Sequence, residues 1–63
     1  MRNANELKIN ILNDKIVQWS EMQSELLNSY MNGKISKNEY KEKYNNLDED
    51  INEFKLEIHE LTK

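Results

Sequence analysis

The sequence of 63 residues contains no cysteine, no proline and a single glycine. The lack of cysteine excludes a disulfide framework and a thiolate zinc site. With no proline present, Gly33 is the strongest helix-ending signal in the chain. The chain is also short enough that one small domain is the upper limit, with a modest buried core.

Long hydrophobic runs are missing as well. No apolar stretch approaches the roughly 18 residues of a membrane span, and the N-terminus lacks a signal-peptide core. The net charge of −3 gives no general attraction to nucleic acid or to anionic membranes. We therefore expect a cytoplasmic protein without membrane association, and direct nucleic-acid binding is disfavoured. The abundance of Asn, Lys and Ile suggests an AT-rich bacterial or phage genome.

The residue patterns of catalysis are absent too. The sequence has no nucleophile–base pair, no glycine-rich phosphate loop and no metal quartet. His59 has no second histidine or cysteine near it, and the acidic run at 48–53 lacks EF-hand spacing. We predict no enzymatic activity, no cofactor and no metal, and we interpret the acidic residues as a solvated face.

The stretch 32–36 predicts a turn between two helices. Gly33 favours the left-handed conformation that ends many helices. Ser36 and Glu39 form the S-x-x-E capping box, in which each residue satisfies the other's backbone N–H. Ile35 and Tyr40 then stand at the two positions of a hydrophobic staple, which fixes how the second helix leaves the turn. The helix-ending glycine, the capping box and the hydrophobic staple all indicate one short helix–helix connection.

Heptad spacing predicts the two helices on either side of this turn. We expect residues 1–4 to be frayed and Asn5 to cap a helix over about 5–31, followed by a helix over about 37–62. In the first helix the seam residues are Ile9, Leu12, Ile16, Trp19, Gln23, Leu26 and Tyr30. In the second they are Tyr40, Tyr44, Leu47, Ile51, Phe54, Ile58 and Leu61.

Folding one seam onto the other makes the two signals agree. Residues equidistant from Ile35 face one another, so Tyr30 meets Tyr40 and Trp19 meets Ile51, and every layer pairs an a with a d position. The fold class is therefore all-α: residues 1–63 form a single antiparallel two-helix coiled-coil hairpin. Dimerisation into a four-helix bundle is one extension of this fold.

Charges beside the seam fit the same register. With Ile9 as position a, Lys8 and Lys15 are g positions in the first helix. Asp50 and Glu57 are g positions in the second, and g positions flank the same side of an antiparallel pair. We expect opposite charges to meet there, although exposed pairs contribute only about 0.2–1 kcal/mol each.

Two seam residues have more than one interpretation. Gln23 is the only polar residue between the ends of the seam, where it either fixes the register or bends its amide towards water. Trp19 is large enough to cover much of a two-helix core, and tryptophan is also enriched at binding hot spots.

Several apolar residues fall outside the seam, six of them in the first helix: Leu7, Ile11, Val17, Met22, Leu27, Met31 and, in the second, Leu56. A plain hairpin does not need them. They indicate a second buried surface, supplied by another hairpin or by a groove on a different protein. The candidate interface residues are Tyr30, Met31, Ile35 and Tyr40 at the tip, with Trp19, Met22 and Leu27 along the first helix.

From residue 28 to about 58 the chain resembles the coiled-coil arm of large serine recombinases, the phage-type integrases. The resemblance lies in a turn of the form Y-x-x-G-x-I-[ST]-x-x-x-[YF], here Tyr30 to Tyr40, which is similar to the SHOCT motif as well. In that family the arm is an antiparallel hairpin on a zinc-containing DNA-binding domain, and its tip contacts other arms during synapsis. The resemblance implies a role in DNA recombination, with tip contacts at Tyr30, Met31, Ile35 and Tyr40. The catalytic serine domain and the zinc ligands are missing from this chain.

These observations together predict a protein–protein interaction module from a phage or mobile element, which binds itself, a larger protein, or both. Two alternatives stay open. One is an RNA-binding dimer of helical hairpins with the architecture of Rop, in which Lys8, Asn10, Lys15 and Gln18 would line part of the RNA face. The other is a small phage-encoded inhibitor that binds a host protein.

Overall fold

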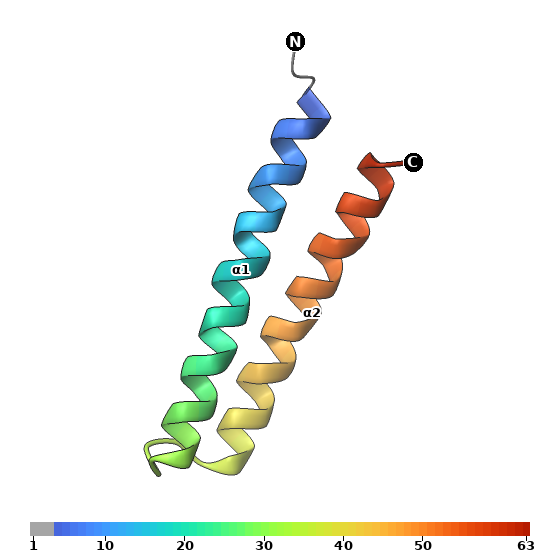
Figure 1. Cartoon of the computed structure of the whole chain (residues 1–63). Coiled ribbons are helices and arrows are strands. Elements are labelled where there is room, and N and C mark those ends of the chain that lie inside the picture. The colour runs from blue at the N-terminus through green and yellow to red at the C-terminus, as the bar shows by residue number, and fades with distance from the viewer. Residues whose placement is uncertain (1–3) are drawn as a thin grey trace.

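The computed structural model describes residues 4–63 and contains two helices, α1 (Ala4–Met31) and α2 (Lys37–Leu61). They pack antiparallel as a hairpin, and the described residues include no strand (Figure 1). The predicted all-α antiparallel hairpin is therefore confirmed. Its extents are 50 × 17 × 10 Å, so the molecule is a thin rod with the turn at one end.

Helix α1 starts earlier than expected. Ala4 is already helical, so Asn5 lies inside the first turn and the prediction that it caps the helix is wrong. Alanine has the highest helix propensity of all residues, which favours extension of the helix to this position. The other residues expected to be frayed, 1–3, lie outside the described part of the chain.

The end of α1 is a Schellman motif centred on Gly33. The N–H of Gly33 donates to the carbonyl of Tyr30 at 3.0 Å, and the N–H of Lys34 donates to the carbonyl of Ser29 at 2.9 Å. Gly33 has φ 75°, in the left-handed region, and among residues 4–63 it alone has a positive φ. These bonds satisfy carbonyls that the helix end would otherwise leave without a partner.

Helix α2 begins with the predicted N-cap. Ser36 is extended, and its Oγ accepts the N–H of Glu39 at 3.1 Å. The reciprocal half of the capping box is replaced: the Glu39 carboxylate accepts from Lys43 Nζ at 3.5 Å, one turn further along. An ammonium at i+4 is a natural helical partner for an exposed carboxylate, so it competes with the backbone N–H of Ser36.

The heptad seam is the core of the hairpin. Leu12, in the second layer from the open end, and Ile51, in the middle layer, are 7% and 5% exposed and are the buried hydrophobic residues of the described chain. Every other predicted seam residue is half-buried except Tyr44, which is 36% exposed. Burial follows the predicted heptad over the full length of both helices. Because each helix packs against only one other helix, most seam residues still contact water.

Aromatic rings meet across the seam in two places. Tyr30 stacks on Tyr40 as expected, and Trp19 packs against Phe54, one seam position beyond Ile51. Helical side chains lean towards the N-terminus of their own helix, and this direction carries the Trp19 ring towards Phe54. The fold axis at Ile35 is kept.

Candidate interaction surface

Trp19 uses both its ring and its N–H inside the hairpin. Its ring meets Phe54 edge to face, with centroids 5.3 Å apart and planes at 88°. Its Nε1 donates to Asp50 Oδ2 at 3.0 Å. The residue is half-buried, and these contacts belong to the core-packing interpretation of Trp19.

Gln23 bridges the helices through its amide. Its Nε2 donates to the main-chain carbonyl of Tyr44 at 3.4 Å, a long hydrogen bond near the solvent edge of the seam. The carbonyl of a helical residue points towards the C-terminus, so this oxygen lies on the side of Tyr44 that approaches Leu47, the expected partner. An interhelical bond of this kind fits the interpretation that Gln23 helps to fix the register.

Charges beside the seam meet aromatic groups rather than each other. Lys15 Nζ lies 5.7 Å from the centroid of the Phe54 ring, and Asp50 accepts from Trp19. The ion pairs that join described residues are local: Lys43–Glu39 lies within α2, and Lys63–Glu60 joins α2 to a residue just beyond its end. The expected interhelical pairing of opposite charges is therefore replaced by a cation–π contact and a charge-assisted hydrogen bond.

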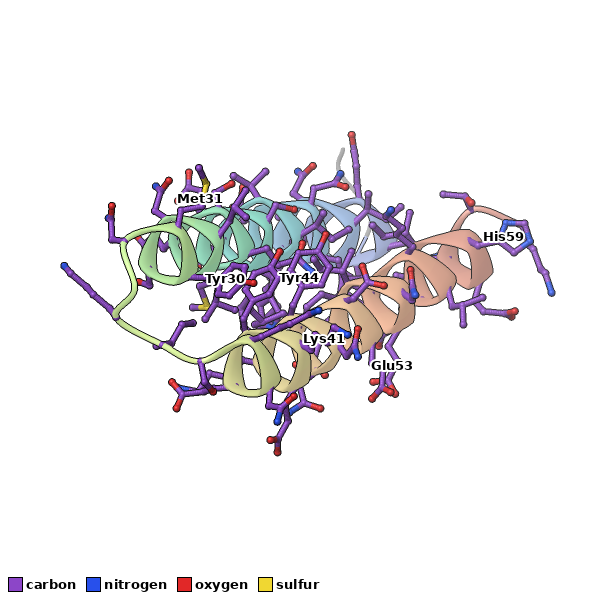
Figure 2. The ribbon with its side chains drawn as sticks, turned by 90° about the horizontal axis from the view of Figure 1, so that it is seen from below. Tyr30, Met31, Lys41, Tyr44, Glu53 and His59 are labelled. Atoms are coloured by element: carbon purple, nitrogen blue, oxygen red, sulfur yellow. The ribbon has the colours of Figure 1, made fainter. Side chains whose placement is uncertain are left out.

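The tip is built on three tyrosines. The rings of Tyr30 and Tyr40 stack with centroids 5.0 Å apart and planes at 11°. The Tyr44 ring is tilted against the Tyr40 ring, with their centroids 5.7 Å apart. Figure 2 shows Tyr30 and Tyr44 between the two helices. Ile35 in the turn is half-buried. Of the predicted tip residues, Tyr30, Ile35 and Tyr40 therefore use part of their surface in packing within the hairpin.

Met31 differs from its neighbours at the tip. Its side chain is 73% exposed and extends away from α2 (Figure 2). It is the last residue of α1, one position before the C-cap, and it adds nothing to the seam. Among the four predicted tip contacts, Met31 is the exposed one, and Tyr30, Ile35 and Tyr40 are half-buried.

Exposed apolar side chains extend well beyond the tip. Among residues 4–63, eight large hydrophobic side chains are exposed: Leu7, Ile11, Val17, Met22, Leu27, Met31, Tyr44 and Leu56. Six of them belong to α1. The predicted interface residues Met22 and Leu27 are both in this set, on opposite flanks of the seam at g and e positions. The exposed apolar surface is therefore spread around α1.

A shallow open groove of about 430 Å³ lies on the g flank near the tip. Its apolar residues are Leu26 and Leu47, from the seam, with Met22 beside them; Glu25, Ser29, Lys43 and Asn46 complete the lining. Of these, the sequence singled out only Met22 as a site residue. The g and c heptad positions of both helices would have located the groove, because g positions flank the same side of an antiparallel pair.

The residues suggested for an RNA face are divided by the fold. Lys8 and Lys15 at g and Gln18 at c share one flank of α1, whereas Asn10 at b is on the other. Lys15 is also engaged with the Phe54 ring. No united basic patch forms from these four residues.

Ligand sets for metals are likewise missing from the part of the chain that the structure describes: residues 4–63 bring together no group of three or more candidate side chains. His59 lies near the end of α2, far from the turn (Figure 2). Neither α1 nor α2, over the same residues, has the length and apolar character needed to cross a bilayer.

Comparison of the chain with protein-family models, with curated proteins and with solved structures gives no match.

Proposed function

We propose that this chain is a non-enzymatic protein–protein interaction module that works through the exposed apolar side chains of α1. One observation carries the proposal: the described residues include only two buried hydrophobic side chains, whereas eight large hydrophobic side chains are exposed. Isolated exposed apolar residues are ordinary, but six on a single helix of a hairpin this thin exceed what its own fold uses.

Energetics support the same conclusion. Ordering a small chain costs about 1.5 kcal/mol per residue, and a single helical seam offsets that cost only narrowly. Covering further apolar surface contributes about 25 cal/mol per Å² removed from water. A second molecule against α1 would therefore add stability that the hairpin alone lacks.

Within this function, a synapsis-controlling arm of the serine-integrase type is the form favoured by the turn. The supporting features are the stacked pair Tyr30 and Tyr40, the left-handed Gly33 and the cap at Ser36, which occupy the positions of the arm-like turn motif. In this form the tip makes the contact. Substitution of Ile35 and Met31 by Asp should then abolish association.

The general proposal is tested by removing the exposed apolar surface of α1. A variant with Ile11, Val17, Leu27 and Met31 all changed to Gln should keep its helical circular dichroism, because none of these side chains lies in the seam. Sedimentation analysis over a wide concentration range should show that the native chain associates and that this variant is monomeric.

Leu56→Gln serves as the matched control, since Leu56 is an exposed apolar residue of α2. It should associate as the native chain does. The proposal fails if the native chain is a monomer at every concentration and binds no partner protein, or if the fourfold variant associates unchanged.

A further inference from the structure

Helix α1 carries a second heptad pattern parallel to its seam. Positions b and e from Asn10 to Met31 follow one another in steps of three and four and hold no charged residue: Asn10, Asn13, Val17, Ser20, Ser24, Leu27 and Met31. We call these seven residues the neutral stripe. All seven are exposed, and Val17 and Leu27 keep 57% and 43% of their surface open.

The charges of the same helix segment lie elsewhere. Asp14 and Glu21 are at f, Lys15 is at g and Glu25 is at c, so every ionic group between residues 10 and 31 is off the stripe. One third of the residues in the chain are charged, yet this face spans six helical turns without one. A face without charge offers nothing to a strongly acidic or basic partner, and it suits burial against another uncharged surface.

The spacing of the stripe also allows it to pair with a second copy of itself in the antiparallel sense. Read in both directions from its centre between Ser20 and Ser24, it places Val17 opposite Leu27 and Asn13 opposite Met31. Each of these pairs joins an e position to a b position, which is the a-to-d pairing of an antiparallel coiled coil transferred to this face. The small serines at the centre would let the two helix backbones approach closely.

We propose that a second copy of this chain docks here, α1 against α1 and antiparallel, with a two-fold axis level with residue 22. This inference rests on the proposed function and names its partner. A two-fold interface uses the same patch on both molecules. It places Val17 of one copy on Leu27 of the other twice, on either side of a central layer of serines.

The arrangement has one unfavourable element, which makes it sharply testable. Glu21, at f, borders the stripe beside the proposed axis and meets its own copy there. Two like charges held side by side oppose association. Removing them should strengthen the dimer, an effect that docking through the tip or through the groove near Met22 does not predict.

The first experiment measures the dimer dissociation constant by sedimentation equilibrium. Glu21→Gln should tighten it about two- to fivefold, the range expected for an exposed pair of charges. Glu25→Gln, the same change one turn away at a c position further from the stripe, should have no effect. Ser24→Lys should weaken the dimer at least about tenfold because it puts a charge into the closest contact. Gln18→Lys, off the stripe, should not.

The second experiment fixes orientation. The chain has no cysteine, so Val17→Cys and Leu27→Cys can be mixed without background thiols. On oxidation the mixed Val17–Leu27 crosslink should exceed both self-crosslinks, because two copies of residue 17 would lie about 15 Å apart along the antiparallel pair.

The outcomes separate this inference from the proposed function. A dimer that ignores Ser24→Lys and Glu21→Gln but is lost with Ile35→Asp overturns the stripe and leaves the interaction module standing with its contact at the tip. A chain that is monomeric at all concentrations overturns the stripe, and if it also binds no other protein the proposed function falls with it. Preferred self-crosslinks at residue 17 would likewise rule out the antiparallel arrangement.

Discussion

The indole of Trp19 and the carboxylate of Asp50 are hydrogen-bonded across the two helices at 3.0 Å, while the same indole packs edge-on against Phe54. One side chain thus joins a polar and an apolar contact near the middle of the hairpin. Removing one contact at a time should show how much each contributes.

Trp19→Phe keeps a ring against Phe54 and loses the N–H donor. We expect a loss of about 1 kcal/mol in the free energy of unfolding, the usual net value of a hydrogen bond near the surface. Trp19→Ala removes both contacts and should cost about 3 kcal/mol, at the low end for a truncated aromatic since Trp19 is only half-buried. Urea denaturation followed by circular dichroism measures both.

Asp50→Ala gives the complementary test, with Asp48→Ala as its control. Asp50 accepts from Trp19, whereas Asp48 lies on the e flank away from that ring. The Asp50 change should cost about 1 kcal/mol in the native chain and much less in the Trp19→Phe background. Equal losses in both backgrounds would mean that the hydrogen bond contributes no stability.

Gly33 is confined by its backbone conformation and not by crowding. Its φ is +75°, and a Cβ placed there would meet nothing within 4 Å. Gly33→Ala should therefore destabilise the hairpin by about 1–2 kcal/mol through left-handed strain alone. Gly33→Asn should cost less, because asparagine tolerates this region better than alanine. Thermal melts rank the two; an alanine variant as stable as the native chain would contradict the Schellman geometry.

Ser36 supplies the side-chain cap of α2. Ser36→Ala removes the acceptor for the Glu39 N–H and should lower stability by about 1 kcal/mol. Ser36→Asp keeps an acceptor and adds a negative charge at a helix N-terminus, so it should be neutral or stabilising. A melting temperature for Ser36→Asp as low as that of the alanine variant would argue against the capping role.

Gln23 should make the hairpin less stable than an apolar residue at the same seam position would, while helping to fix the register of the two helices. Gln23→Leu replaces a long 3.4 Å hydrogen bond to Tyr44 with apolar packing in the seam, so we expect about 1 kcal/mol of added stability. For a chain of this size that corresponds to a rise of about 4–8 °C in the melting temperature. Differential scanning calorimetry measures the shift. Gln18→Leu, at an exposed position off the seam, should leave it unchanged.

The fold was predictable because independent local signals agreed. Gly33 and Ser36 located the turn, and the spacing of residues such as Leu12 and Ile51 located the buried face; both gave the same axis. The Trp19–Phe54 contact was missed because heptad positions place residues in layers and do not include the lean of a large ring towards the N-terminus of its helix. Asn5 was misplaced because Ala4, a strong helix former, extends the helix past the expected cap.

The candidate surface was only partly visible in the sequence. Off-seam apolar residues such as Met22 and Leu27 could be identified from spacing, and both are exposed. The exposure of the individual tip residues could not be predicted from spacing, because the Tyr30–Tyr40 stack depends on ring geometry. The same is true of the groove between Leu26 and Leu47, which exists only once the two helices are placed side by side.

Helices α1 and α2 respectively start and finish at the same end of a 50 Å rod, opposite the turn (Figure 1). A surface anchor or fluorophore attached near either terminus would therefore hold the bend at a distance from its support. Binding measured on such an immobilised layer would sample the tyrosine-bearing end with little steric shielding, whereas label-to-label energy transfer between copies would report whether they associate head to head or flank to flank.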